Sequence, residues 1–148
     1  MTDLTLIHTA QVHCDTFDRL APHADLSHTV RPDWLARAQN GIDDRLAAEI
    51  TAAVKATEGP VLCSCTTLGA VAESAGAIRI DWPMMHRAAE IGGPVLLVYC
   101  LDSTAQPSQE LLQRAFGTSD PQMTRLLLAQ HWPLFEAGEL DVFNRALA

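Results

Sequence analysis

The sequence predicts an α/β protein in which a parallel sheet is flanked by helices. Short apolar runs of strand length, such as residues 4–7 and 94–101, alternate along the chain with segments of helical spacing. Glycine and proline, at 59–60 and 92–94 for example, separate the two kinds of segment. Strands that alternate with helices form parallel sheets, and ligands bind to such sheets beyond the carboxyl ends of the strands.

The first 60 residues predict two strands, each followed by helical sequence. The strands are expected at 4–7 and, with a weaker pattern, at 26–31. Helices are expected between His8 and Pro22, from Pro32 to Asn40, and from Asp43 to Gly59. In the last of these, apolar side chains recur every four residues at Leu46, Ile50 and Val54, which gives the helix one face to pack on a sheet.

The rest of the chain repeats this alternation. Strands are expected from Val61 through Cys63, at 94–101 and at 123–130, and residues 78–81 lead into Pro83. Helices are expected at 70–74, 84–91, 107–116 and 133–147. Because Gly92, Gly93 and Pro94 interrupt the pattern, a boundary between two lobes, 1–92 and 93–148, is expected there.

Composition and charge exclude several classes of function. The 148 residues include ten Lys and Arg against eighteen Asp and Glu, so the net charge is −8, and no basic cluster offsets it. Such a chain repels nucleic acid and anionic lipid. No apolar stretch approaches the roughly 20 residues that span a bilayer, and the N-terminus has no basic region before its apolar run. A cytoplasmic protein without a membrane anchor is expected.

The segment VLCSCTTLG, residues 61–69, has the strongest chemical interest. Side chains alternate along a strand, so Val61, Cys63 and Cys65 share one face. Cys65 comes last, at the start of the loop before a helix, whose positive N-terminal end favours a thiolate. The amide groups of that turn, with the hydroxyls of Thr66 and Thr67, can hold a carboxylate.

Simpler interpretations of the cysteines stay open. Free cysteine is often a small buried hydrophobe, and packing alone explains Cys63. No metal site is expected at Cys63 and Cys65, because no second Cys or His pair stands at the spacing of a zinc finger. The four cysteines, at 14, 63, 65 and 100, form no small secreted framework, so thiols are expected rather than disulfides.

Two further polar segments follow predicted strands. His8 and Thr9 end the first strand, at the same edge of the sheet as Cys65, although a loop histidine is more often only polar surface. Asp102, Ser103 and Thr104 follow the strand that ends near Cys100, and a helix-capping loop explains them equally well. No glycine-rich phosphate loop, nucleophile-elbow serine or H-E-x-x-H motif occurs in the sequence.

Five segments carry a resemblance to the aspartate/glutamate racemase superfamily, which includes hydantoin racemases and arylmalonate decarboxylases. They are, in order, IHTAQVHCDTFDRL, VRPDWLARAQNG, VLCSCTTLG, IRIDWPMM and VLLVYCLDSTAQPSQELL. The resemblance implies two similar α/β lobes with a cleft between them and proton transfer by cysteine thiols without a cofactor. It also implies the following site residues: Cys65 as acid/base thiol, Thr66 and Thr67 on a substrate carboxylate, and His8, Thr9, Ser103 and Thr104 lining the cleft.

The chain departs from the family pattern in its second lobe. Two-base members use one cysteine from each lobe, and no cysteine follows Cys100 here. The segment LFEAGELDVFNRALA resembles the family's penultimate region, so the second lobe, 93–148, is expected to be partial. One thiol supports proton transfer on one face of a carbon, or protonation after decarboxylation, whereas racemisation needs a second group such as Cys100 or His131.

The sequence therefore predicts a cofactor-independent racemase- or isomerase-like protein that acts on or binds a small, amino-acid-like carboxylate. The alternative is a non-catalytic relative that binds a small acid or serves as an assembly partner. A partial second lobe exposes an apolar edge, and a second copy can cover it, so a homodimer is expected.

Overall fold

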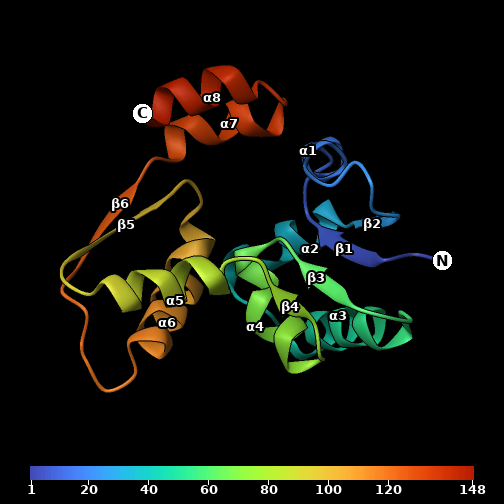
Figure 1. Ribbon diagram of the computed structural model, residues 1–148, viewed down its shortest axis with the longest axis horizontal. Coiled ribbons are helices and arrows are strands. Elements are labelled where there is room, and N and C mark those ends of the chain that lie inside the picture. The colour runs from blue at the N-terminus through green and yellow to red at the C-terminus, as the bar shows by residue number, and fades with distance from the viewer. The chain divides into compact units, whose positions relative to one another are not determined.

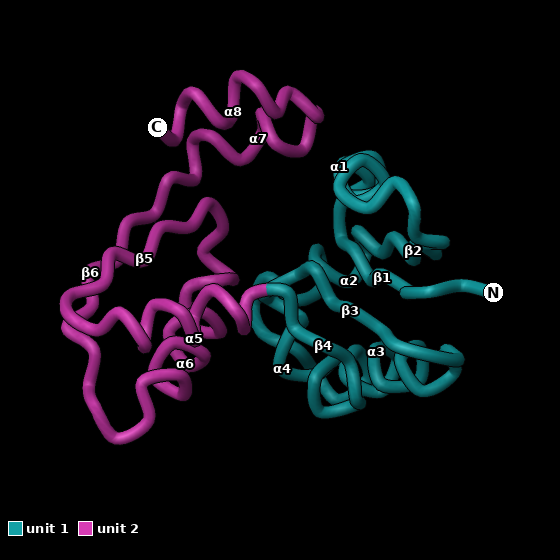
Figure 2. The backbone as a smooth tube through the Cα atoms, viewed as in Figure 1, with its two compact units in different colours: residues 1–80 teal, residues 81–148 magenta.

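The structure, a computed structural model, describes all 148 residues and confirms an α/β fold with parallel strands flanked by helices (Figure 1). The chain divides into two compact units, Met1–Ile80 and Asp81–Ala148 (Figure 2). This boundary precedes the expected one at residue 92. The difference arises because helix α5, Trp82–Ile91, packs on helix α6, Ala105–Phe116, in the second unit.

Unit 1 contains a four-stranded parallel sheet. Its strands are β1 (Leu4–His8), β2 (Leu26–Val30), β3 (Val61–Cys63) and β4 (Ile78–Arg79), in the order β2-β1-β3-β4. Strand β1 is central, and its neighbouring residues Leu6 and Ile7, which point to opposite faces, are both buried. Burial on both faces explains why two apolar residues, Leu6 and Ile7, stand next to each other in this strand.

Helices cover this sheet on both sides. Those of unit 1 are α1 (Val12–Leu20), α2 (Pro32–Arg37), a 3₁₀ turn (Ala38–Asn40), α3 (Asp44–Ala56) and α4 (Thr66–Ser74). Figure 1 shows α1 on the opposite side of the sheet from α3 and α4. The Asp43 carboxylate accepts a hydrogen bond from the Leu46 N–H (2.7 Å) and so caps α3. The predicted stripe of Leu46, Ile50 and Val54 is buried.

Helix α4 begins earlier than the sequence predicted. It starts at Thr66 rather than near Ala70, whereas β3 ends at Cys63, as predicted. Cys65 has extended backbone angles and its carbonyl already accepts a bond from the Leu68 N–H (3.2 Å). The prediction was late because threonines were treated as loop residues, although hydroxyl side chains are well tolerated at a helix N-terminus.

Unit 2 has a two-stranded parallel sheet, β5 (Val95–Tyr99) and β6 (Met123–Leu127). One core joins this sheet to α5 and α6, and its buried members are Met85, Leu97, Leu111 and Leu112. Because only alternate residues of β5 face this core, Leu96 and Val98 point to the other side of the sheet, where they are exposed.

The C-terminal segment differs from the predicted single helix over 133–147. Two helices form instead, α7 (Trp132–Glu136) and α8 (Leu140–Leu147), with 3₁₀ turns at Asp102–Thr104 and Ala129–His131 earlier in the unit. The single-helix prediction was wrong because Gly138 adopts φ of 75°, a left-handed conformation that ends a helix. Phe135 joins the two helices by ring contacts with Trp132 (4.9 Å) and Phe143 (5.4 Å).

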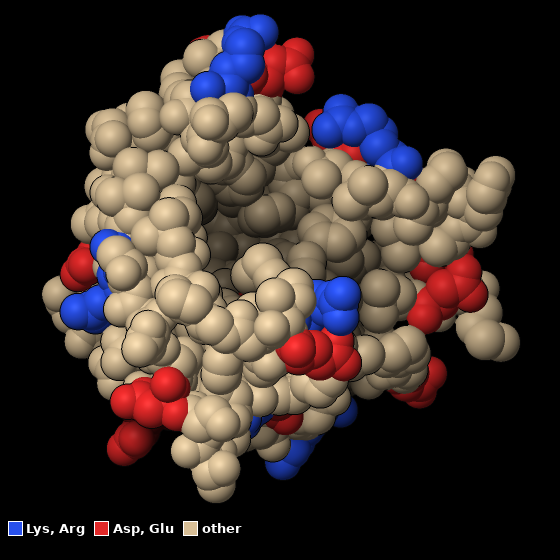
Figure 3. Space-filling view, turned by 60° about the vertical axis from the view of Figure 1, so that its left-hand side comes forward, with Lys and Arg blue, Asp and Glu red and all other residues tan.

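The surface carries mixed charge. On the face drawn in Figure 3, most Lys and Arg side chains lie beside Asp or Glu, and wide areas without these residues lie between one such group and the next. Ion pairs of this kind include Arg31 with Asp33 (2.6 Å) and Arg37 with Glu49 (2.8 Å). None of the helices combines the length and apolar character required to cross a membrane.

Candidate functional site

The carboxyl ends of β1 and β3 lie side by side. The parallel register pairs Ile7 with Cys63, so these two side chains share one face of the sheet. The next residue, Ser64, donates its N–H to the Ile7 carbonyl (3.0 Å) and directs its hydroxyl to the other face, where it meets His8. The two segments that the sequence analysis singled out therefore meet at one edge.

Cys65 occupies the position immediately before α4, and only 8% of its surface is exposed. Thr67, in the first turn, is buried, and Thr66 is half-buried. Cys63 is almost fully buried in β3 and its thiol donates to the Cys65 carbonyl (3.5 Å). A thiol, two hydroxyls and the amide groups of a helix N-terminus thus lie within three consecutive residues, a set of groups that can bind an anion and move a proton.

A buried arginine lies against the same helix. Arg79, at the end of β4, is 4% exposed, and its guanidinium occupies the space next to Gly69 of α4. A Cβ atom at position 69 would lie 2.7 Å from the Arg79 Nε atom, so only glycine permits this approach. Arg79 was not a predicted site residue, because nothing local in the sequence shows that β4 brings its side chain to α4.

On the other face of the sheet, His8 belongs to a chain of hydrogen bonds that crosses three elements. Its Nδ1 atom lies 2.6 Å from the Ser64 hydroxyl, and its Nε2 atom lies 2.9 Å from Nδ1 of His28 on β2. The Nε2 atom of His28 in turn lies 3.0 Å from the Asp18 carboxylate on α1. His8 is fully buried, and both of its ring nitrogens form hydrogen bonds with other side chains.

The environment of His8 keeps its imidazole neutral. Burial, followed by repulsion from His13 and His28, lowers the pKa of His8 to about 4, against a smaller opposing effect of Asp18. Burial also lowers the pKa of His13, whose ring stacks on His8 with 5.3 Å between centroids. At neutral pH the His8 ring therefore has one N–H donor and one acceptor nitrogen.

A third sulfur lies beside these histidines. Cys14 of α1 is 8% exposed, and burial, followed by the charges of Asp18 and Asp15, raises the pKa of its thiol. Its Sγ atom and one ring nitrogen of each of His8 and His28 lie within 4.8 Å of one another. Cys14 and His28 were not predicted site residues, although the four-residue spacing of Cys14 and Asp18 puts these two on one face of α1.

Thr9 and the second-lobe candidates have the following positions. Thr9 is 7% exposed and directly follows His8 in unit 1. Ser103 and Thr104 lie half-buried in the 3₁₀ turn of unit 2, where the Thr104 hydroxyl donates to the Leu101 carbonyl (2.7 Å). Cys100 is half-buried too, and burial raises the pKa of its thiol. Together with His131, also of unit 2, these residues belong to the unit that does not contain Cys65.

Unit 2 also contains an open cavity of about 650 Å³. Gly93 and Pro94, just before β5, and Pro121 and Gln122, just before β6, contribute to its wall. This places the cavity at the amino ends of the two strands. Ligands of parallel α/β sheets bind at the carboxyl ends instead, so the residues around Cys65 and His8 are the stronger candidates.

No protein-family model, curated protein or solved structure matches the chain. Its function is inferred from the side chains themselves. They form two sets in unit 1: the thiol and hydroxyls of Cys65, Thr66 and Thr67, and the group of His8, His28, Asp18 and Cys14.

Proposed function

We propose that the protein is a member of the racemase superfamily that binds a small, amino-acid-like carboxylate and moves its α-proton with the Cys65 thiol, without a cofactor. The observation that carries this proposal is the position of Cys65, buried at the start of α4 and followed by Thr66 and Thr67. The parallel order β2-β1-β3-β4 of unit 1 supports it, since the resemblance implies a lobe of this α/β type.

The chemistry follows from this arrangement. A carboxylate next to the first turn of α4 is stabilised by the helix dipole and by the threonine hydroxyls. The Cys65 thiolate removes the proton from the adjacent carbon, and the resulting enediolate keeps its negative charge near the same helix end. Return of a proton from the thiol regenerates the substrate with the same configuration, whereas return from the opposite face inverts it.

The acid that would protonate the opposite face of the α-carbon is a further prediction. Cys100 and His131 are the residues that the sequence offers, and Ser103 and Thr104 are the corresponding ligand-binding candidates of unit 2. Exchange of the α-proton with solvent needs only Cys65, whereas inversion needs a second acid. The two reactions therefore separate the contribution of Cys65 from that of its partner.

Solvent exchange provides the test. The protein is incubated in D₂O with a panel of small α-amino and α-hydroxy acids, and deuterium at the α-carbon is followed by NMR. We expect Cys65→Ala to reduce exchange by about 10²- to 10⁴-fold, the usual contribution of a general base. Cys63→Ala is the matched control, because Cys63 is buried in β3 and should leave exchange intact. Equal exchange by Cys65→Ala and the wild type would remove Cys65 from the reaction.

A non-catalytic role as an assembly partner is the second candidate, favoured by the uncovered face of the unit 2 sheet. Leu96 and Val98 point to this face, and the register adds Leu126 opposite Val98. These three side chains are 57%, 45% and 42% exposed. A second copy presents the same uncharged face, so two copies can bury it symmetrically.

Light scattering tests this association. We expect a dimer that Val98→Lys dissociates. Leu20→Lys is the control, because Leu20 is an exposed leucine of unit 1, outside this face. A wild-type protein that remains monomeric at all concentrations would contradict the homodimer.

A further inference from the structure

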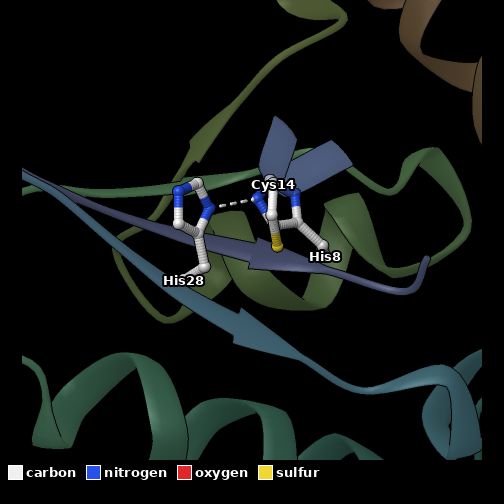
Figure 4. A group of neighbouring side chains, drawn as sticks. All are labelled: His8, Cys14 and His28. Atoms are coloured by element: carbon white, nitrogen blue, oxygen red, sulfur yellow. Dashed lines mark hydrogen bonds between the residues drawn. The ribbon is translucent and has the colours of Figure 1, made fainter. Parts of the chain in front are cut away.

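Three side chains from three different elements direct metal-ligating atoms toward one point in unit 1. His8 comes from β1, His28 from β2 and Cys14 from α1, and their ligating atoms all lie within 4.8 Å of one another. Figure 4 shows the two rings facing each other across their hydrogen bond, with the Cys14 side chain next to His8. His8 and Cys14 are buried, and the His28 side chain is 15% exposed.

The outward nitrogens of both histidines already have the partners that a metal site requires. A metal-bound histidine usually donates its other N–H to a carboxylate, a carbonyl or a similar acceptor, which fixes the ring. Here Asp18 accepts at Nε2 of His28 (3.0 Å), and the Ser64 hydroxyl meets Nδ1 of His8 (2.6 Å). The remaining nitrogens, Nε2 of His8 and Nδ1 of His28, face each other at 2.9 Å.

Each ring nitrogen of His8 and His28 has a partner whether or not an ion lies between the two rings. Without an ion, the Asp18 carboxylate accepts from Nε2 of His28, and Nδ1 of His28 accepts from the His8 Nε2–H. His8 then accepts at its own Nδ1 from the Ser64 hydroxyl. With an ion, the His8 proton moves to Nδ1 and is donated to Ser64, whose hydroxyl donates to the Ile7 carbonyl, at 3.3 Å.

We propose that His8 Nε2, His28 Nδ1 and Cys14 Sγ bind a divalent cation of the zinc type. Two imidazoles and one thiolate suit zinc, which binds nitrogen at about 2.0–2.1 Å and sulfur at about 2.3 Å. In a tetrahedral site two nitrogens stand about 3.3 Å apart, so the rings separate only slightly from their 2.9 Å hydrogen bond. A water completes the fourth position on the partly exposed side of His28.

The ion's effect is to tie α1 to the sheet. Cys14 is the only buried residue of α1, so the helix has little apolar contact to hold it. Ring contacts of His8 with Phe17 (5.4 Å) and the bond between His28 and Asp18 join α1 to β1 and β2. A cation held by one ligand from each of these elements strengthens the same connection. This site is separate from the proposed proton transfer at Cys65 and does not depend on it.

Metal binding to the full-length protein tests the proposal. The protein is reduced, stripped with a chelator and titrated with Co²⁺ and Zn²⁺. We expect one ion per chain and a near-ultraviolet charge-transfer band for Co²⁺ bound to a thiolate. Cys14→Ser should abolish the band, whereas Cys63→Ser, which changes another buried cysteine of the same unit, should retain it.

A second variant excludes a loss caused by misfolding. Asp18 is 60% exposed, so Asp18→Asn should leave the fold intact, yet it should weaken Zn²⁺ binding about 10- to 100-fold by releasing His28. Absence of stoichiometric binding, or a Co²⁺ band that survives Cys14→Ser, would overturn the proposal. Cys65→Ala should bind Zn²⁺ as the wild type does, so a failed exchange reaction leaves this result unaffected.

Discussion

Cys14 and Cys65 lie in the same unit and are equally buried, each with 8% of its surface exposed, yet different groups surround the two thiols. Cys65 precedes α4, at the helix end that stabilises negative charge. Cys14 lies in α1, where burial and then Asp18 and Asp15 raise the pKa of its thiol. Burial alone therefore does not decide the chemistry of a thiol. The thiol of Cys65 lies next to a helix N-terminus, whereas that of Cys14 lies near two carboxylates, so a thiolate at Cys14 needs a cation to offset their charge.

Strand geometry separates the two thiol regions. Cys63 and Ser64 are adjacent in sequence but point to opposite faces of the sheet. Cys63 shares its face with Ile7, whereas Ser64 bonds to His8 on the face toward α1. One short segment thus contributes to two sites on opposite faces of the sheet. Variants that affect one face should leave the other unchanged, and the predictions below use this property.

The largest expected effect is acidification, which acts on the His8 face. The folded protein binds a proton at His8 only near pH 4, whereas the unfolded chain binds it near pH 6.5. Stability from the neutral ring is therefore complete above pH 6.5 and is lost as the pH falls toward 4, by at most about 3 kcal/mol. The groups around the ring that set this value are His13, His28 and Asp18.

Urea unfolding at several pH values in the presence of a chelator measures this loss. His8→Gln has no group that titrates in this range, so its unfolding free energy should change less between pH 6.5 and 4 than that of the wild type. If the two proteins show the same pH dependence, the neutral state of His8 has been wrongly assigned.

A smaller effect is expected from Ser64→Ala, which removes the hydroxyl at Nδ1 of His8 (2.6 Å). A buried ring nitrogen without a partner should lower the free energy of unfolding by about 2 kcal/mol. Ser74→Ala is the matched control, because that exposed hydroxyl bonds only to the Ala70 carbonyl within α4, and it should change stability by less than about 0.5 kcal/mol. Alkylation of Cys65 should be unchanged in Ser64→Ala, and a large change would show that the two faces are coupled.

Much of the fold was predictable because it depends on local patterns. The apolar run of β1 and the four-residue spacing of Leu46, Ile50 and Val54 report burial directly, and both predictions are confirmed. The break between α7 and α8 was not predicted, because the helical spacing of Leu140, Phe143 and Leu147 was extended back to residue 133 past Gly138. In that segment the backbone conformation of one glycine decides the structure, and apolar periodicity does not.

The candidate sites were predictable only in part. The position of Cys65 follows from the order strand, cysteine, hydroxyls, helix, which is visible in the sequence. The contact between His8 and His28 depends on the register of β1 with β2, which pairs Leu6 with His28 and so puts both rings on one face. Sequence alone does not fix that register. The same holds for Arg79, whose contact with Gly69 requires the docking of α4 beside β4.

Alkylation of the wild-type protein, mapped by mass spectrometry with and without Zn²⁺, tests the contrast between the two thiols most directly. Cys63, at 1% exposure, serves as the unreactive internal standard. We expect Cys65 to react faster than Cys14 in the presence of a chelator. Zinc at about 100 times its Kd should then protect Cys14 about 100-fold and leave the rate at Cys65 unchanged. Equal reactivity of the two thiols with chelator, or equal protection of both by zinc, would contradict the account.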